Sequence, residues 1–126
     1  MTLRNEVFVY CREHFGTEPE YLWQTDPNFA VLRRAENKKW YGIIMDIPRQ
    51  KLGLEGGEKV DILNIKCPEQ LLGSFLGQEG FHPAYHMNKS RWLTVRLDGS
   101  VSPDQIFGLL EMSFELTKGG KGRARA

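Results

Sequence analysis

Apolar residues recur at intervals of three or four positions in two segments, one near each end of the chain. Over residues 3–15 this spacing predicts an amphipathic helix, with a threonine before it for capping and a glycine after it as the stop. A Ser-Pro-Asp-Gln capping sequence beginning at Ser102 precedes the second segment and predicts a helix over about residues 103–117. Between them, a proline opens a shorter predicted helix over residues 68–76.

Elsewhere the pattern changes from helical spacing to extended runs of β-branched, aromatic and alternating residues. Strands are predicted over residues 29–34, 40–47, 59–66 and 91–97. The first two are separated only by residues 35–39, which predicts a hairpin with Asn37 suited to a positive φ. The connection over residues 17–27 contains a further short run, 21–23, that suits a strand. The polar, Gly-rich residues 49–58 are expected to form a loop.

Helices at both ends and strands between them predict one α+β domain over residues 1–117. We expect two layers, a mostly antiparallel sheet with the helices packed on one face, so that the other face stays partly open. Alternation in the last strand places Trp92 on the face opposite its leucines and valine, and Trp40 can share that face. Two interpretations remain for these rings: an exposed interaction surface, or packing under an edge loop.

Composition describes an ordinary globular chain with a basic end. The 126 residues are 40% hydrophobic and 26% charged, and the formal net charge is +1. Residues 118–126 hold four of the 17 Lys and Arg and no acid, which leaves 13 against 16 Asp and Glu over residues 1–117, a net charge of −3. The Gly-rich tail is expected to be disordered. The acidic balance of the domain argues against a surface that attracts DNA everywhere.

Several absences bear on the compartment. No apolar run approaches the length of a membrane span, and the first residues lack the apolar stretch of a signal peptide. Two cysteines, Cys11 and Cys67, make no disulfide framework. We therefore expect a protein of the bacterial cytoplasm.

The chain contains no familiar motif for catalysis or metal binding. A phosphate-binding Gly-Lys-Ser/Thr loop, a G-x-S-x-G elbow, paired C-x-x-C motifs and H-E-x-x-H are all missing. His82 and His86 have a metal-ligating spacing, but Pro83 disfavours the helical turn that it requires, so hydrogen-bonded histidines are favoured. Cys67 precedes the proline of a helix start, yet no base partner is evident and a buried thiol is favoured over a reactive one. We expect no enzymatic activity, no cofactor and no metal.

One stretch of the sequence carries a resemblance to a known family. The run Pro-Ala-Tyr-His-Met-Asn-Lys over residues 83–89, followed by Trp92 on a strand and by the turn at 97–99, resembles the MmcQ/YjbR family. The Tyr-Gly pair at 41–42 and the helix starting at 69–71 fit as well, so the resemblance covers nearly the whole chain. It implies a two-layer α+β fold similar to that of type III secretion chaperones, also described as a double wing. Members are commonly named DNA-binding, and the resemblance transfers no catalytic residue.

On this resemblance, the segment 85–92 and the hairpin cations are the candidate DNA contacts. Lysine suits a phosphate, asparagine a base edge, and tyrosine or tryptophan a stacked base. The candidates are Arg33, Arg34, Lys38, Lys39, Tyr85, His86, Asn88, Lys89, Arg91 and Trp92. The alternatives are that the hairpin cations are a solvated strand end and that the later residues shape the turn into the strand.

Two functions remain in competition. The first is DNA binding through the hairpin wings and the 85–92 segment, with an affinity that falls steeply with salt. The second is a protein- or peptide-binding module that uses the open aromatic sheet face, with weaker salt dependence and sensitivity to Trp92→Ala. DNA binding is the working hypothesis.

Overall fold

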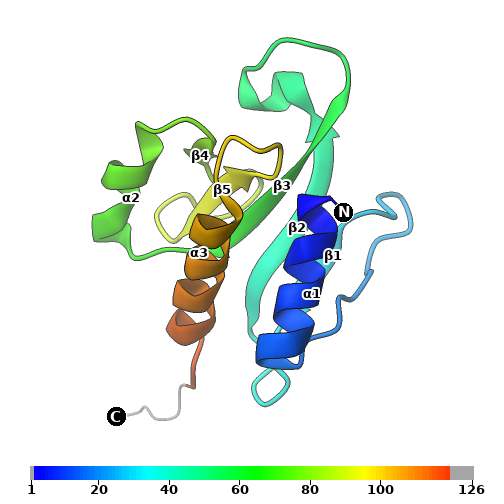
Figure 1. The fold of residues 1–126 in the computed structure, drawn as a ribbon, viewed down its shortest axis with the longest axis vertical. Helices are drawn as coiled ribbons and strands as arrows, with labels where there is room; N and C mark the ends of the chain where they lie inside the picture. The colour runs from blue at the N-terminus through cyan, green and yellow to red at the C-terminus, as the bar shows by residue number, and fades with distance from the viewer. Residues whose placement is uncertain (1, 120–126) are drawn as a thin grey trace.

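Five strands form a single antiparallel sheet in the order β1-β2-β3-β5-β4, accompanied by three helices (Figure 1). The structure is a computed structural model that describes residues 2–119. The strands are β1 (Ala30–Arg33), β2 (Trp40–Pro48), β3 (Lys59–Lys66), β4 (Phe81–Pro83) and β5 (Trp92–Arg96). The helices are α1 (Leu3–Phe15), α2 (Glu69–Leu76) and α3 (Pro103–Leu116), with a 3-10 turn, η1 (Arg49–Leu52), after β2. The predicted α+β class is confirmed, whereas most of the predicted basic tail lies outside the described residues.

The two terminal helices begin and end where their capping residues predict. The Thr2 hydroxyl accepts a hydrogen bond from the Asn5 amide at 3.1 Å, and Gly16 ends α1 with a left-handed φ of 66°. The Ser102 hydroxyl accepts from the Gln105 amide at 3.2 Å at the start of α3. Within residues 2–119, none of the helices is long and apolar enough to cross a membrane.

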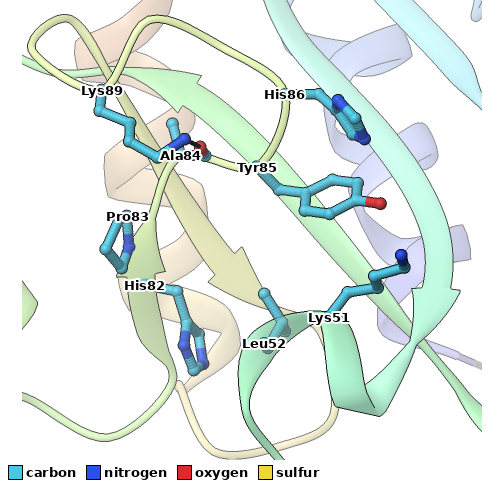
Figure 2. A pocket seen from close by; sticks show the side chains of 8 residues that line it. All are labelled: Lys51, Leu52, His82, Pro83, Ala84, Tyr85, His86 and Lys89. Carbon is cyan, nitrogen blue, oxygen red and sulfur yellow. Dashed lines mark hydrogen bonds between the residues drawn. The ribbon is translucent and has the colours of Figure 1, made fainter.

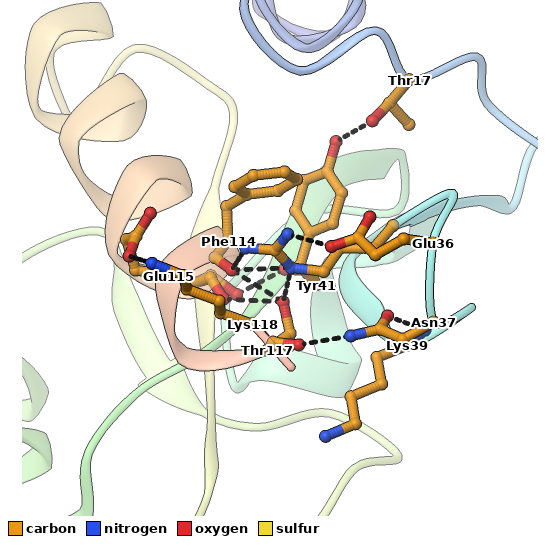
Figure 3. Close-up of polar contacts among 11 residues, drawn as sticks. Thr17, Glu36, Asn37, Lys39, Tyr41, Phe114, Glu115, Thr117 and Lys118 are labelled. Atoms are coloured by element: carbon orange, nitrogen blue, oxygen red, sulfur yellow. Dashed lines mark hydrogen bonds and ion pairs between the residues drawn. The ribbon is translucent and has the colours of Figure 1, made fainter. Parts of the chain in front are cut away.

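The hairpin between β1 and β2 forms as predicted, but a different residue takes the positive φ. Lys38, with φ 64°, occupies the left-handed conformation that was predicted for Asn37. The amide group of Asn37 instead makes two hydrogen bonds. Its Oδ1 accepts from the Lys39 amide and its Nδ2 donates to the Thr117 carbonyl, each at 2.9 Å (Figure 3). The Asn37 side chain therefore joins a local contact within the turn to a contact with the end of α3.

Short strands were the least predictable part of the sheet. Residues 21–23 do not form the predicted strand, because only the preceding Glu20 makes a bridge, to Val31 at the sheet edge. Residues 81–83 form the unpredicted strand β4, which pairs with β5. A three-residue strand with a proline has almost no sequence signal, and Pro83 is tolerated because β4 lies at the edge of the sheet.

The main core lies between the sheet and the helices, which cover one face of it (Figure 1). A bulge in β2 adds an aromatic residue to this core: Trp40 pairs with Arg33 and Gly42 with Leu32, which leaves Tyr41 as the extra residue. Tyr41 is fully buried against Phe15 and Phe114, at ring centroid distances of 5.6 and 5.0 Å. Its hydroxyl donates to Thr17 Oγ1 at 2.7 Å (Figure 3).

Arg34 fastens the hairpin to the end of α3. Its side chain is 6% exposed and donates to the Phe114 carbonyl at 3.1 and 2.7 Å and to Thr117 Oγ1 at 3.1 Å. The guanidinium also lies 3.7 Å from the centroid of the Phe114 ring. Arg34 adds charged donors to the Phe114 carbonyl, which also accepts from Thr117, and a cation at this end complements the helix dipole.

Replacing Arg34 by alanine should therefore destabilise the fold. We expect the Arg34→Ala variant to lose about 2–3 kcal/mol of unfolding free energy, because the Phe114 carbonyl and the Thr117 hydroxyl lose a charged donor. Chemical denaturation measures this loss. Arg33→Ala is the matched control, since Arg33 pairs with Glu20 at the surface. Equal losses in the two variants would contradict the role given to Arg34.

Candidate nucleic-acid interface

The face of the sheet opposite the helices carries a second, smaller apolar cluster. Its buried members are Val31, Ile43, Met45, Ile47, Val60 and Ile62. Two loops supply the rings and side chains that partly cover it: Trp23 and Phe29 come from the connection before β1, and Tyr85 and Met87 from the segment between β4 and β5. The expected open face is thus present, but loops cover part of it.

The segment 84–91 is held on this face by two buried polar side chains of the sheet. Asn64 of β3 donates to the Tyr85 carbonyl at 3.0 Å, and the Tyr85 amide donates to Thr94 Oγ1 at 2.9 Å. The Thr94 hydroxyl completes the network by donating to Asn64 Oδ1. Asn64 and Thr94 are fully buried, so they bond only to each other and to the main chain of Tyr85.

Contacts within the segment show why its residues shape a turn. Asn88 Oδ1 accepts from the Ser90 amide at 2.9 Å and from the Ser90 hydroxyl at 2.8 Å. Lys89 Nζ donates to the Ala84 carbonyl at 2.9 Å, although the residue is exposed. His86 has a positive φ of 60° and an exposed ring next to that of Tyr85, at a centroid distance of 4.1 Å. Asn88 is occupied in the turn, whereas Lys89 and His86 remain accessible at its surface.

For Trp92, the structure agrees with the packed alternative and not with an exposed ring. The residue is 7% exposed, with Lys66 Nζ 5.7 Å from its ring centroid. A ring buried in this way is not available for stacking on a base. Trp40 is half-buried on the open face, with its ring centroid 6.1 Å from that of Trp23.

The four hairpin cations divide into two pairs. Arg33 makes two hydrogen bonds to the Glu20 carboxylate, at 2.9 and 2.5 Å, and Arg34 is buried at the end of α3. Lys38 and Lys39 are exposed and have no carboxylate within ion-pair distance among residues 2–119. The lysines are therefore the accessible part of the predicted hairpin contact.

Lys39 belongs to a group of cations at one end of the open face. Burial lowers the pKa of Lys66, and the positive charges of Lys39 and Arg91 lower it further. Lys66 is thus close enough to Lys39 and to Arg91 to be repelled by both, and it lines a hollow with Arg91 and the acidic Glu69. Neutralising that repulsion by an anion would be favourable.

Two lysines, Lys51 and Lys89, and two histidines line a cleft of about 410 Å³ between η1 and the segment 82–89 (Figure 2). Lys51 lies on one side, and His82, His86 and Lys89 lie on the other. The other lining residues are Leu52, Pro83, Ala84 and Tyr85, so this cleft has no carboxylate in its lining.

Beside the cleft is an apolar pocket of about 330 Å³ on the open face. Its lining residues are Trp23, Phe29, Trp40, Ile43, Met45, His86 and Met87. His86 is common to the pocket and the cationic cleft. Trp23, Phe29, Lys51 and Lys66 were not among the predicted contacts. Trp40 on the predicted open face, the candidate His86 and the aromatic run around residue 22 were separate signals for parts of this pocket, but nothing in the sequence joined them.

The other candidate chemistry has little structural basis. In the described part of the chain, no group of three or more His, Cys, Asp or Glu side chains is placed to hold a metal ion. Cys67 is 2% exposed, and burial raises the pKa of its thiol, which opposes thiolate formation at the start of α2. Cys11 is fully buried, and burial raises the pKa of its thiol to about 12.

The network at Tyr85 predicts a defined effect of removing one hydroxyl. Thr94→Val should lower the unfolding free energy by about 1–3 kcal/mol, because it leaves the Tyr85 amide and Asn64 without their buried partner. It should also speed hydrogen exchange at the Tyr85 amide. Thr25→Val, at an exposed threonine, is the control and should leave exchange at Tyr85 unchanged. Unchanged exchange in Thr94→Val would refute the anchoring role.

His82 predicts a pH dependence of stability. Its Nε2 is buried without a hydrogen-bond partner among the described residues, and burial followed by the charge of Arg96 lowers its pKa below the ordinary 6.5. The unfolded chain therefore takes up the proton more readily. The contribution of neutral His82 to the unfolding free energy is therefore complete above about pH 6.5. It is lost as the pH falls toward the lower pKa of the folded state. Denaturation at about pH 7 and pH 5.5 should show a smaller decline in His82→Gln than in the wild type; equal declines would count against it.

Comparisons with known proteins agree with the fold and the sequence resemblance. The sequence pattern that defines the YjbR family matches residues 12–116. Uncharacterized protein YyaQ of Bacillus subtilis (strain 168) is 42% identical over 118 residues, which cover 94% of this chain and 100% of YyaQ.

Solved structures show the same architecture. The crystal structure of a Pseudomonas syringae protein has a TM-score of 0.89 at 40% identity, covering 91% of this chain and 98% of that chain. Deinococcus radiodurans protein DR2400, with a DUF419 domain, has a TM-score of 0.74 and covers 98% of this chain and 84% of its own. At 21% identity, the second likeness shows the fold alone. Together with the match over residues 12–116, these findings establish that the chain belongs to the YjbR family.

Proposed function

We propose that this protein binds DNA, without catalysing a reaction, through the cation-bearing face of the sheet opposite the helices. The observation that carries the proposal is the distribution of cations that have no acidic partner. Among residues 2–119, those at or beside this face with no carboxylate within 4.0 Å include Lys38, Lys39, Lys51, Lys66, Lys89 and Arg91. Cations that have already formed ion pairs gain less from a phosphate than these do.

The distribution of acids weakens the objection raised by the net charge of the domain. Helices α1 and α3, over 3–15 and 103–116, carry five carboxylates and two arginines, which is a net charge of −3. That equals the net charge of residues 1–117, so the rest of the domain is neutral overall. A phosphate backbone approaching the open face would have the acidic helices on the far side of the sheet.

Each group of cations suits the DNA backbone more than a base edge. Lys39, Lys66 and Arg91 form one cluster, and Lys51 and Lys89 line the cleft. Lysine acts on phosphate as a mobile point charge, and such contacts position a protein without reading the sequence. We therefore propose binding with little sequence preference and a strong dependence on salt.

Fluorescence anisotropy with a labelled DNA oligonucleotide across a salt series tests the proposal. Lys39→Gln/Arg91→Gln should reduce the slope of log K against log salt by about 2 and weaken binding about tenfold or more, because two phosphate contacts are lost. The control Arg12→Gln/Lys59→Gln removes the same charge from cations that are paired with Glu18 and Asp46. It should bind like the wild type.

A chain ending at Gly119 separates the domain from the basic tail, since this truncation removes Lys121, Arg123 and Arg125. The proposal requires that this shorter chain retain salt-dependent binding. Binding by the full-length chain alone would assign the activity to a polycation, and absence of binding by both would refute the proposal.

A second candidate function is the binding of a protein or peptide. It is favoured by the apolar pocket around Trp23 and Trp40 and by two exposed apolar residues of the same connection, Tyr21 and Leu22, which are 55% and 48% exposed. Such binding would depend weakly on salt. Because Trp92 is buried, Trp92→Ala tests the fold instead of this surface.

A further inference from the structure

The apolar pocket on the open face is built from aromatic rings that are only partly used in packing. Trp23 lies between Phe29 and Trp40, with centroid distances of 6.0 and 6.1 Å and interplanar angles of 73° and 82°. In an edge-to-face pair, one of the two rings keeps its faces free of the partner. All three residues are half-buried, so solvent still reaches them.

The rest of the pocket suits a flat apolar ligand. Ile43 and Met45 of β2 form its floor, and His86 and Met87 come from the segment between β4 and β5. Methionine adapts its shape to an aromatic ligand and makes favourable sulfur–aromatic contacts. No carboxylate lines the pocket, which offers no partner for a cationic ligand.

The surroundings of the pocket suit a ligand that carries a negative charge next to a flat apolar ring. His86 forms part of both the pocket and the cleft lined by Lys51 and Lys89. An apolar site for a ring therefore adjoins a cationic site. This combination is complementary to a nucleotide unit, in which an aromatic base is attached to an anionic backbone.

We infer that the pocket at Trp23, Phe29 and Trp40 takes up an unpaired base of a single-stranded nucleic acid while the adjoining cations hold its backbone. This inference rests on the proposed DNA binding and specifies its ligand. A base in a duplex is stacked and paired, so it must first be extruded before it can enter a pocket of this kind. The folded domain consequently prefers a single strand to a duplex.

The experiment compares a labelled 20-residue thymidine oligonucleotide with a duplex of the same length, using the full-length protein at one salt concentration. We expect the single strand to bind about tenfold more tightly or better, since stacking on aromatic side chains contributes to every captured base. Trp23→Leu should abolish this preference and reduce the quenching of tryptophan fluorescence. Tyr21→Leu, at an exposed aromatic outside the pocket, should leave both unchanged.

Each result distinguishes the inference from the proposed function. Equal or tighter binding of the duplex overturns base capture while DNA binding stands. A preference for the single strand that persists in Trp23→Leu also overturns base capture, and the pocket is then assigned to peptide binding. Absence of binding to both ligands overturns both proposals.

Thermal unfolding of Trp23→Leu checks that it is folded, and quenching of the wild-type tryptophans by the single strand gives an independent readout. A uridine oligomer of equal length separates DNA from RNA, and the tighter ligand is then assigned as the source of the base.

Discussion

A sheet has two faces, and this chain has enough terminal helix to cover only one of them. The helices seal the larger core, whereas the apolar side chains on the other face must be covered by connecting segments. Loops cover a sheet less completely than helices do, because their backbone groups need partners or solvent. Asn64 and Thr94, both buried, supply such partners in one loop, where they form hydrogen bonds with the main chain of Tyr85. The cleft and the pocket both exist because the cover is incomplete.

This constraint explains why the candidate site combines residues with unrelated local roles. Asn88 shapes a turn, Lys89 binds a carbonyl of its own loop, and Met87 fills an apolar surface. The same segment contributes His86 to the boundary between the cationic cleft and the aromatic pocket. Residues that cover the sheet are therefore also residues of the proposed binding surface, so mutations in this segment need a stability measurement beside any binding assay.

Local patterns predicted the features that are decided locally. The helix over 3–15 was correct at both ends because capping depends on neighbouring residues. The positive φ lies at Lys38 and not at the predicted Asn37, whose side chain bonds to Thr117, 80 residues away. Rules based on neighbouring residues cannot predict a contact between residues so far apart in the sequence.

The candidate site was predicted less well than the fold, for the same reason. A resemblance in sequence identified the family and pointed to the segment that contains His86 and Lys89. It did not show that Trp92 is buried, because that depends on how the sheet and its loops pack. The apolar pocket escaped prediction since Trp23, Trp40 and His86 come from three separate parts of the chain and meet only after folding.

The separation of charge between the two layers has a consequence for the kinetics of association. If the cations of the open face bind a polyanion as proposed, the acidic helices on the other side of the sheet give the domain a separation of charge, and hence a dipole, across the sheet. In the field of a polyanion, such a dipole experiences a torque that turns the cationic face forward before contact. Fewer encounters are then wasted in the wrong orientation, even though the domain as a whole is repelled at long range by its net negative charge.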